Sequence, residues 1–153
     1  MTRVKQQGFT LIELMVVLVI IGIASAAISL SIKPDPLRLL RKDAERLSQL
    51  LQVAQAEARA DGRAITWRAD AKGFRFSRPT DDGLGVEYFN RDEQLRPRPW
   101  DSTPMQVRIE PRQILILNAE WINPPLHVVL SDGQHSLSLQ RDAAGLLRVV
   151  NQP

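Results

Sequence analysis

The chain has 153 residues, the size of one domain on the usual range of about 100 to 200 residues, so a multidomain enzyme is not expected. It contains no cysteine, which excludes a disulfide scaffold, cysteine zinc ligands and a cysteine nucleophile. The 20 Lys and Arg against 17 Asp and Glu give a net charge of +3, and so small an excess is weak evidence for nucleic-acid binding.

The first predicted element is an apolar helix near the amino terminus. Residues Leu14 to Ile32 contain neither charge nor proline, and as a helix they would be about 28 Å long, close to the ~30 Å hydrocarbon core of a bilayer. Three interpretations compete: a plain membrane anchor, a cleaved secretory signal with a small-residue site at Ala24-Ser25-Ala26, and an anchor in which Glu13 has a role. Glu13 argues against the first two, because a carboxylate is costly in lipid and weakens an export signal.

The sequence Gly8-Phe9-Thr10-Leu11-Ile12-Glu13 resembles the processing site of type IV prepilins and of the pseudopilins of type II secretion. The resemblance implies that a membrane-embedded prepilin peptidase removes residues 1–8 as a leader, cutting between Gly8 and Phe9, and that the new terminal amine of Phe9 is methylated. Residues 9–32 would then be a retained transmembrane helix. Glu13 would be the fifth residue of the mature chain, and in this family that carboxylate meets the amino terminus of a neighbouring subunit.

Charge counting alone would give the opposite topology. Two cations, Arg3 and Lys5, precede the apolar segment, whereas Lys33, Arg38, Arg41 and Lys42 follow it closely, and positive charge normally stays in the cytoplasm. The resemblance to prepilins requires the leader to face the cytoplasm. We therefore expect a single-pass inner-membrane protein with residues 33–153 in the periplasm.

A second helix is predicted after Pro34. Asp35 is a candidate N-cap with Pro36 in the first helical position, and Gly62 is a candidate C-terminal cap. Apolar residues recur between them at spacings of three and four, at Leu40, Ala44, Leu47, Leu51, Ala54 and Ala58. This stripe indicates a helix packed on a sheet, with a coiled-coil seam as the alternative.

Strands are predicted in the remainder of the chain. Ala64 to Arg68 and Phe74 to Arg78 form a predicted hairpin, with Phe74 and Phe76 on one face. An irregular, proline-rich stretch covers residues 79–104 and holds one short candidate strand, Val86 to Phe89. Further candidates are Gln106 to Glu110, Ile114 to Leu117, Leu126 to Leu130, Ser136 to Gln140 and Leu146 to Val150. The expected fold is α+β and pilin-like: a long amino-terminal helix, half transmembrane and half amphipathic, packed on one or two antiparallel sheets.

Two further segments, Gly73-Phe74-Arg75-Phe76 and Leu95-Arg96-Pro97-Arg98-Pro99-Trp100, are similar to the H-type minor pseudopilins of type II secretion. The resemblance implies a pseudopilus subunit that helps to export folded proteins across the outer membrane. Its implied partners are the prepilin peptidase, other major and minor pseudopilins and the inner-membrane secretion platform.

No arrangement of residues indicates catalysis, so no enzyme activity, cofactor or metal is expected. His127 and His135 belong to predicted strands without a cysteine or carboxylate at ligand spacing, and the loop Asp81-Asp82-Gly83 fits neither a phosphate-binding nor a calcium-binding pattern. Trp67 and Trp121 are expected in a core or an interface. Trp100, in the arginine-rich loop, is the candidate for an exposed contact with a partner.

Two other functions stay open. Some minor pilins bind DNA during uptake, but residues 113–153 carry only two Arg or Lys and three Asp or Glu, so no basic stripe is evident there and nucleic-acid binding is the alternative. The third possibility is an exported globular protein without a filament role.

Overall fold

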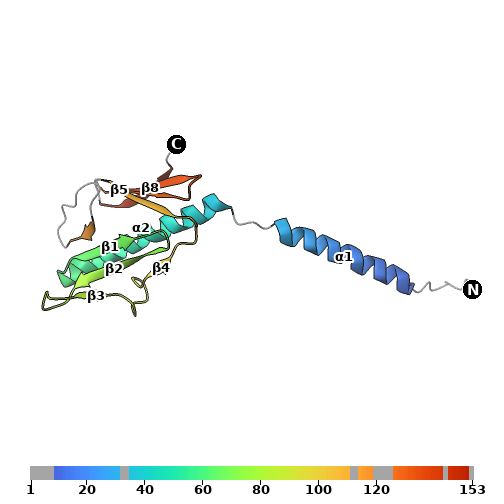
Figure 1. The fold of residues 1–153 in the computed structure, drawn as a ribbon, viewed down its shortest axis with the longest axis horizontal. Helices are drawn as coiled ribbons and strands as arrows, with labels where there is room; N and C mark the ends of the chain where they lie inside the picture. The colour runs from blue at the N-terminus through green and yellow to red at the C-terminus, as the bar shows by residue number, and fades with distance from the viewer. Residues whose placement is uncertain (1–8, 32–34, 111–113, 119–125, 143–144, 152–153) are drawn as a thin grey trace, which may run out of the picture. The chain divides into compact units, whose positions relative to one another are not determined.

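The computed structural model describes residues 9–31, 35–110, 114–118, 126–142 and 145–151, with the side chains of residues 28–31 outside that description. The chain divides into two compact units, Met1–Pro34 and Asp35–Pro153. Each unit is described by itself below, and Figure 1 shows the elements of both.

The first unit contains one helix, α1 (Leu11–Ser31), as predicted. Its large apolar side chains from Leu11 to Ile23 are 46% to 79% exposed and point in all directions around the helix axis. A helix that is apolar all round has no single face toward a core and is usually covered by lipid or by other helices. Among the described residues, no helix meets the combined length and apolarity needed to cross a membrane.

The second unit begins with α2 (Pro36–Asp61), and both predicted caps are confirmed. The Asp35 side chain accepts the Leu37 N–H at 3.1 Å, and Gly62 ends the helix in the left-handed conformation with φ of 68°, which glycine adopts without steric cost. All six residues of the predicted apolar stripe are buried in the core. The helix packs against strands of two sheets, so the coiled-coil alternative does not describe this unit.

Sheet A has five antiparallel strands. Its order is β3 (Val86–Tyr88), β2 (Gly73–Pro79), β1 (Ile65–Ala69) and β6 (Leu115–Leu117), and β4 (Arg98–Pro99) pairs with the turn end of β2. The predicted hairpin is confirmed, with Trp67 opposite Phe76. The short strand β4 was not predicted, because two prolines flank Arg98 and proline removes ladder donors.

Sheet B has four antiparallel strands in the order β5 (Gln106–Glu110), β7 (His127–Ser131), β8 (Ser136–Arg141) and β9 (Leu147–Asn151). The predicted α+β class is thereby confirmed. In Figure 1, α2 runs beside both sheets, in agreement with its contacts to β1 and β6 on one side and to β7, β8 and β9 on the other. One core is therefore shared by α2 and both sheets.

The described contacts predict that residues 33–153 fold without α1. The second unit carries its own helix, both sheets and the whole buried core, and a domain with its own core generally folds alone. A soluble fragment of these residues is expected to unfold in urea in one cooperative transition, followed by tryptophan fluorescence. A fragment that aggregates in every buffer and shows no transition would place the domain boundary elsewhere.

Candidate processing and assembly site

The predicted cleavage point lies at the edge of the described chain. Gly8 falls outside the described residues, whereas Phe9 precedes α1 and its side chain is 85% exposed. No described residue of its unit belongs to a buried core against which the Phe9 ring could pack. The backbone on the carboxyl side of the proposed cut is therefore not covered by other described parts of that unit.

Thr10 and Glu13 build the start of α1. The Glu13 N–H lies 3.3 Å from the Thr10 Oγ1 and 3.1 Å from the Thr10 carbonyl oxygen, and the Leu14 N–H lies 3.3 Å from that same oxygen. Threonine followed three residues later by glutamate is the spacing of a capping box, in which the first side chain satisfies a free N–H of the helix end. The spacing of Thr10 and Glu13 alone is enough to predict this cap, although the cap was not predicted above.

The Glu13 side chain is exposed in the first turn of α1. A carboxylate is stabilised there by the positive end of the helix dipole, and it makes no ion pair with any residue in the described ranges. Among the described residues of its own unit, the negative charge therefore has no counter-charge. The charge is available to a cationic group of another molecule.

A second polar cluster fixes the loop between β4 and β5 to α2. The Asp43 side chain is fully buried. The backbone N–H of Asp101 donates to both Asp43 carboxylate oxygens, at 3.1 Å to Oδ1 and 3.0 Å to Oδ2, and the N–H of Ser102 donates to Oδ2 at 2.8 Å. Arg46 approaches the same carboxylate at 2.6 Å and donates to the Pro99 carbonyl at 2.9 Å. Burial raises the pKa of the Asp43 carboxyl, although the two N–H donors and Arg46 oppose the rise.

The cluster around Asp43 was not predicted from the sequence. Asp43 lies three residues after Leu40 and four before Leu47, so its position on the apolar stripe was visible in the spacing. Arg46 is a charged residue outside the apolar stripe, yet its side chain is only 25% exposed. Nothing local in the sequence indicates that residues 101–102 supply the donors, because they are far from Asp43 along the chain.

The expectation that Trp100 is an exposed partner contact is wrong. Trp100 is 4% exposed, its ring centroid lies 4.7 Å from that of Phe74, and its Nε1–H donates to the Asp70 carbonyl at 2.8 Å. The indole therefore attaches the irregular loop to the β1–β2 hairpin. Trp67 is buried as expected, and Trp121 lies outside the described residues.

The described part of the chain holds no group of three or more residues suited to a metal ion. Each histidine has a carboxylate nearby: Glu110 for His127 and Asp132 for His135. Sequence spacing does not indicate the first of these two pairs. The Nδ1 of His127 lies 3.3 Å from Glu110 Oε2 because β5 and β7 place the two residues opposite each other. Asp132 Oδ2 lies 3.1 Å from His135 Nδ1.

Asp82 caps its own turn by accepting the Leu84 N–H at 3.1 Å, as expected of a solvated loop.

The architecture is that of a pilin-like protein: an apolar amino-terminal helix with a carboxylate in its first turn, followed by an amphipathic helix packed on antiparallel sheets. The family model for the prokaryotic N-terminal methylation motif matches residues 3–29. This match confirms the motif on which the resemblance to prepilins was based.

The named relatives belong to type II secretion. The chain is 37% identical over 79 residues to type II secretion system protein H of Aeromonas hydrophila, a match that covers 50% of this chain and 42% of that protein. The fold is similar to that of the minor pseudopilin EpsH from the type 2 secretion system of Vibrio cholerae, with a TM-score of 0.58 at 16% identity over 73% of this chain and 96% of that one. The resemblance to H-type pseudopilins is thereby confirmed, over part of the relative's length in sequence and over most of the chain in fold.

Proposed function

We propose that the chain is a minor pseudopilin of a type II secretion system, matured between Gly8 and Phe9, that takes part in the export of folded proteins across the outer membrane. The observation that carries the proposal is the methylation motif at residues 3–29 on a chain whose partial sequence match is to an H protein of that system. Its proposed partners are the prepilin peptidase, other pseudopilins and the inner-membrane platform.

The proposed mechanism is assembly, without covalent chemistry by this chain. Residues 9–32 would anchor the protein in the inner membrane and residues 33–153 would lie in the periplasm. The exposed apolar surface of α1 supports this, as does the uncharged sequence through Ile32, which extends beyond the side chains that the structure describes. Small residues in the same helix allow other helices to approach closely; they are Gly22, Ala24, Ala26 and Ala27.

The DNA-binding alternative has less support. Both named relatives are type II secretion proteins, and sheet B carries few cations on its final strands.

Deleting the gene in a cell that carries the rest of the secretion system tests the proposal. Exported proteins should accumulate in the periplasm, and the full chain supplied in trans should restore their release. Normal secretion with impaired DNA uptake would contradict the proposal and favour the alternative.

Glu13 is expected to act in assembly and not in maturation. Glu13→Gln keeps the shape of the side chain and removes its charge, so an ion pair with a neighbour's amino terminus is lost while the cut after Gly8 is unaffected. The variant should be processed and membrane-bound, but should crosslink poorly to other pseudopilins and support little secretion. Because an amide can replace part of the hydrogen bonding, Glu13→Ala and Glu13→Lys complete the series. Wild-type incorporation and secretion by all three variants would contradict this role.

A further inference from the structure

The outer face of sheet A, the face that points away from the core, carries two adjacent arginines. Side chains alternate along a strand, so burial of Trp67, Phe74 and Phe76 on the core side turns Arg68 and Arg75 outward. The two arginines lie directly opposite each other in the β1–β2 register, and both are exposed. Within the described ranges, neither makes an ion pair.

Such a pair costs stability, because like charges directly opposite each other across a strand pair repel. Arg75 is held over the Tyr88 ring, with Cζ 5.7 Å from the ring centroid, and Asp70 attracts its charge without forming an ion pair with it. Arg78 on the same strand differs: it pairs with Glu57, Asp61 and Glu87. Among the described residues, three carboxylates thus form ion pairs with Arg78 and none does so with Arg68 or Arg75.

A hollow of about 500 Å³ lies at the turn end of this face, between the β1–β2 turn and β4. Its lining includes four cationic residues, Arg68, Lys72, Arg75 and Arg98, against the single carboxylate of Asp70. That carboxylate accepts the Lys72 N–H at 2.8 Å and the Gly73 N–H at 3.0 Å, which hold its pKa below the ordinary value. The hollow therefore keeps an excess of positive charge.

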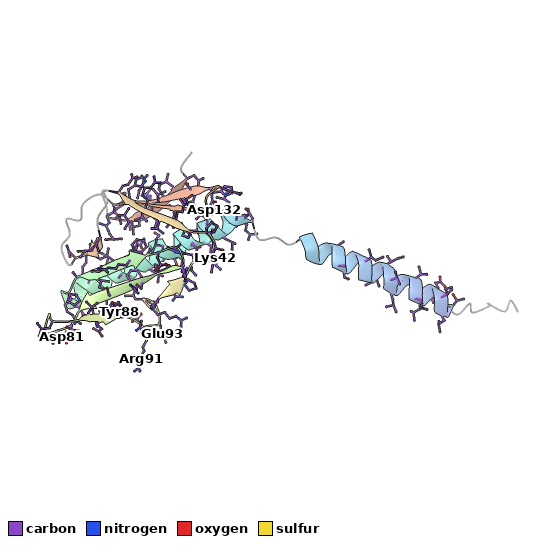
Figure 2. All side chains as sticks on the ribbon, viewed as in Figure 1. Lys42, Asp81, Tyr88, Arg91, Glu93 and Asp132 are labelled. Carbon is purple, nitrogen blue, oxygen red and sulfur yellow. The ribbon has the colours of Figure 1, made fainter. Side chains whose placement is uncertain are left out.

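Apolar side chains border the arginines. One row across the sheet runs from Tyr88 through Ser77 and Thr66 to Ile116, and its two ends, Tyr88 and Ile116, are each 48% exposed. Figure 2 shows Tyr88 on the β3 side of this unit. Val86, two residues before Tyr88, is also exposed. The surface thus combines a small cationic centre with an apolar rim.

We propose that the outer face of sheet A is a docking surface for another protein subunit, one that presents a carboxylate flanked by apolar side chains. The Cβ atoms of residues directly opposite in a strand pair are about 5 Å apart, so one Asp or Glu side chain can reach both guanidinium groups. Binding would supply the ion-pair partner that Arg68 and Arg75 do not have among the described residues. That this partner is another pilus subunit rests on the proposed function, whereas the carboxylate-binding surface does not.

The surface fits a protein better than a nucleic acid. A DNA contact usually neutralises several phosphates spaced along the duplex, which needs a stripe of cations. Here four cationic residues gather around one hollow with Asp70 among them, and the neighbouring row of the sheet ends in the apolar side chains of Tyr88 and Ile116. Charged groups with an apolar surround are typical of protein interfaces.

The substitution Arg68→Glu separates docking from folding. It places a carboxylate opposite Arg75 and keeps the contact of Arg75 with Tyr88, so the repulsive pair becomes an attractive one and the thermal midpoint should stay the same or rise. Docking should weaken, because the new glutamate both repels the partner's carboxylate and occupies Arg75. Arg108→Glu is the matched control: Arg108 is an exposed arginine on β5 of sheet B, and the charge change is identical.

The full chain in detergent is titrated with a fluorescein-labelled peptide of alternating glutamate and valine, with its glutamine counterpart and with a short DNA duplex, using fluorescence anisotropy. The glutamate peptide should bind on the order of tenfold more tightly than the glutamine peptide, and Arg68→Glu should remove that difference while Arg108→Glu keeps it. Equal binding of the two peptides, an equal loss with Arg108→Glu, or tighter binding of DNA would overturn the proposal. In cells, a secretion defect in the deletion strain together with normal secretion by Arg68→Glu would overturn the docking surface and leave the proposed function standing.

Discussion

Replacing Asp43 with alanine is expected to lower the free energy of unfolding by about 3 kcal/mol, the usual effect of removing one partner of a buried charged cluster. The substitution leaves the N–H groups of Asp101 and Ser102 without their acceptor and Arg46 without its nearest carboxylate. Asp43→Asn should cost less, because an amide oxygen still accepts one of these hydrogen bonds. Urea unfolding of residues 33–153, or of the full chain in detergent, measures both effects.

Glu45 provides the matched control for Asp43. It is an exposed acidic residue on the same helix, and surface substitutions of this kind usually change stability by less than about 0.5 kcal/mol. Glu45→Ala should therefore unfold at nearly the wild-type urea concentration. If Asp43→Ala and Glu45→Ala were equally stable, the attachment of the loop to α2 by Asp43 would contribute nothing measurable.

Replacing Gly8 with tryptophan is expected to abolish maturation. In the proposed function the peptidase cuts after Gly8, and a bulky side chain at that position obstructs the approach of the protease to the backbone, which glycine leaves open. Wild-type protein isolated from membranes should begin at a methylated Phe9. The Gly8→Trp variant should retain residues 1–8. Mass spectrometry of the intact protein distinguishes the two forms by the mass of the leader.

Gly22→Leu is the control for this experiment. Gly22 is a second glycine in the amino-terminal unit, and a Cβ atom built there meets nothing within 4 Å, so the variant should be processed normally. A mature terminus at Ala27 in the wild-type protein would contradict the prediction, because that cut is the one expected of an ordinary secretory signal.

Elements with a local signal were predictable from the sequence. Asp35, Pro36 and Gly62 mark the ends of α2 by capping chemistry, and the stripe from Leu40 to Ala58 predicts its buried face through helical spacing. The methylation motif is equally local, since six consecutive residues carry it. In each case the physical cause lies within a few residues of the feature.

Features that depend on distant residues were not predictable in the same way. Trp100 lies in a proline-rich stretch that suggests an irregular loop. In the structure, however, its ring packs against Phe74 and its Nε1–H donates to the Asp70 carbonyl. The candidate strand Ile114 to Leu117 carried no prediction of its neighbour, and in the structure Leu115–Leu117 pairs with β1 in sheet A. Periodicity tells which residues form a strand and which face is apolar, but it does not identify the neighbouring strand.

The path of the chain between the two sheets has a consequence for the export that the proposed topology requires of this protein. After β4 in sheet A the chain enters sheet B at β5, returns to sheet A at β6 and goes back to sheet B at β7. Sheet A is therefore incomplete until Leu117 has been delivered, and by then sheet B has only its first strand. A chain that crosses the inner membrane with its amino terminus anchored would expose unpaired strand edges for most of its translocation, and such edges invite aggregation. In the proposed topology, both sheets are therefore expected to form together, after nearly all of the chain has reached the periplasm.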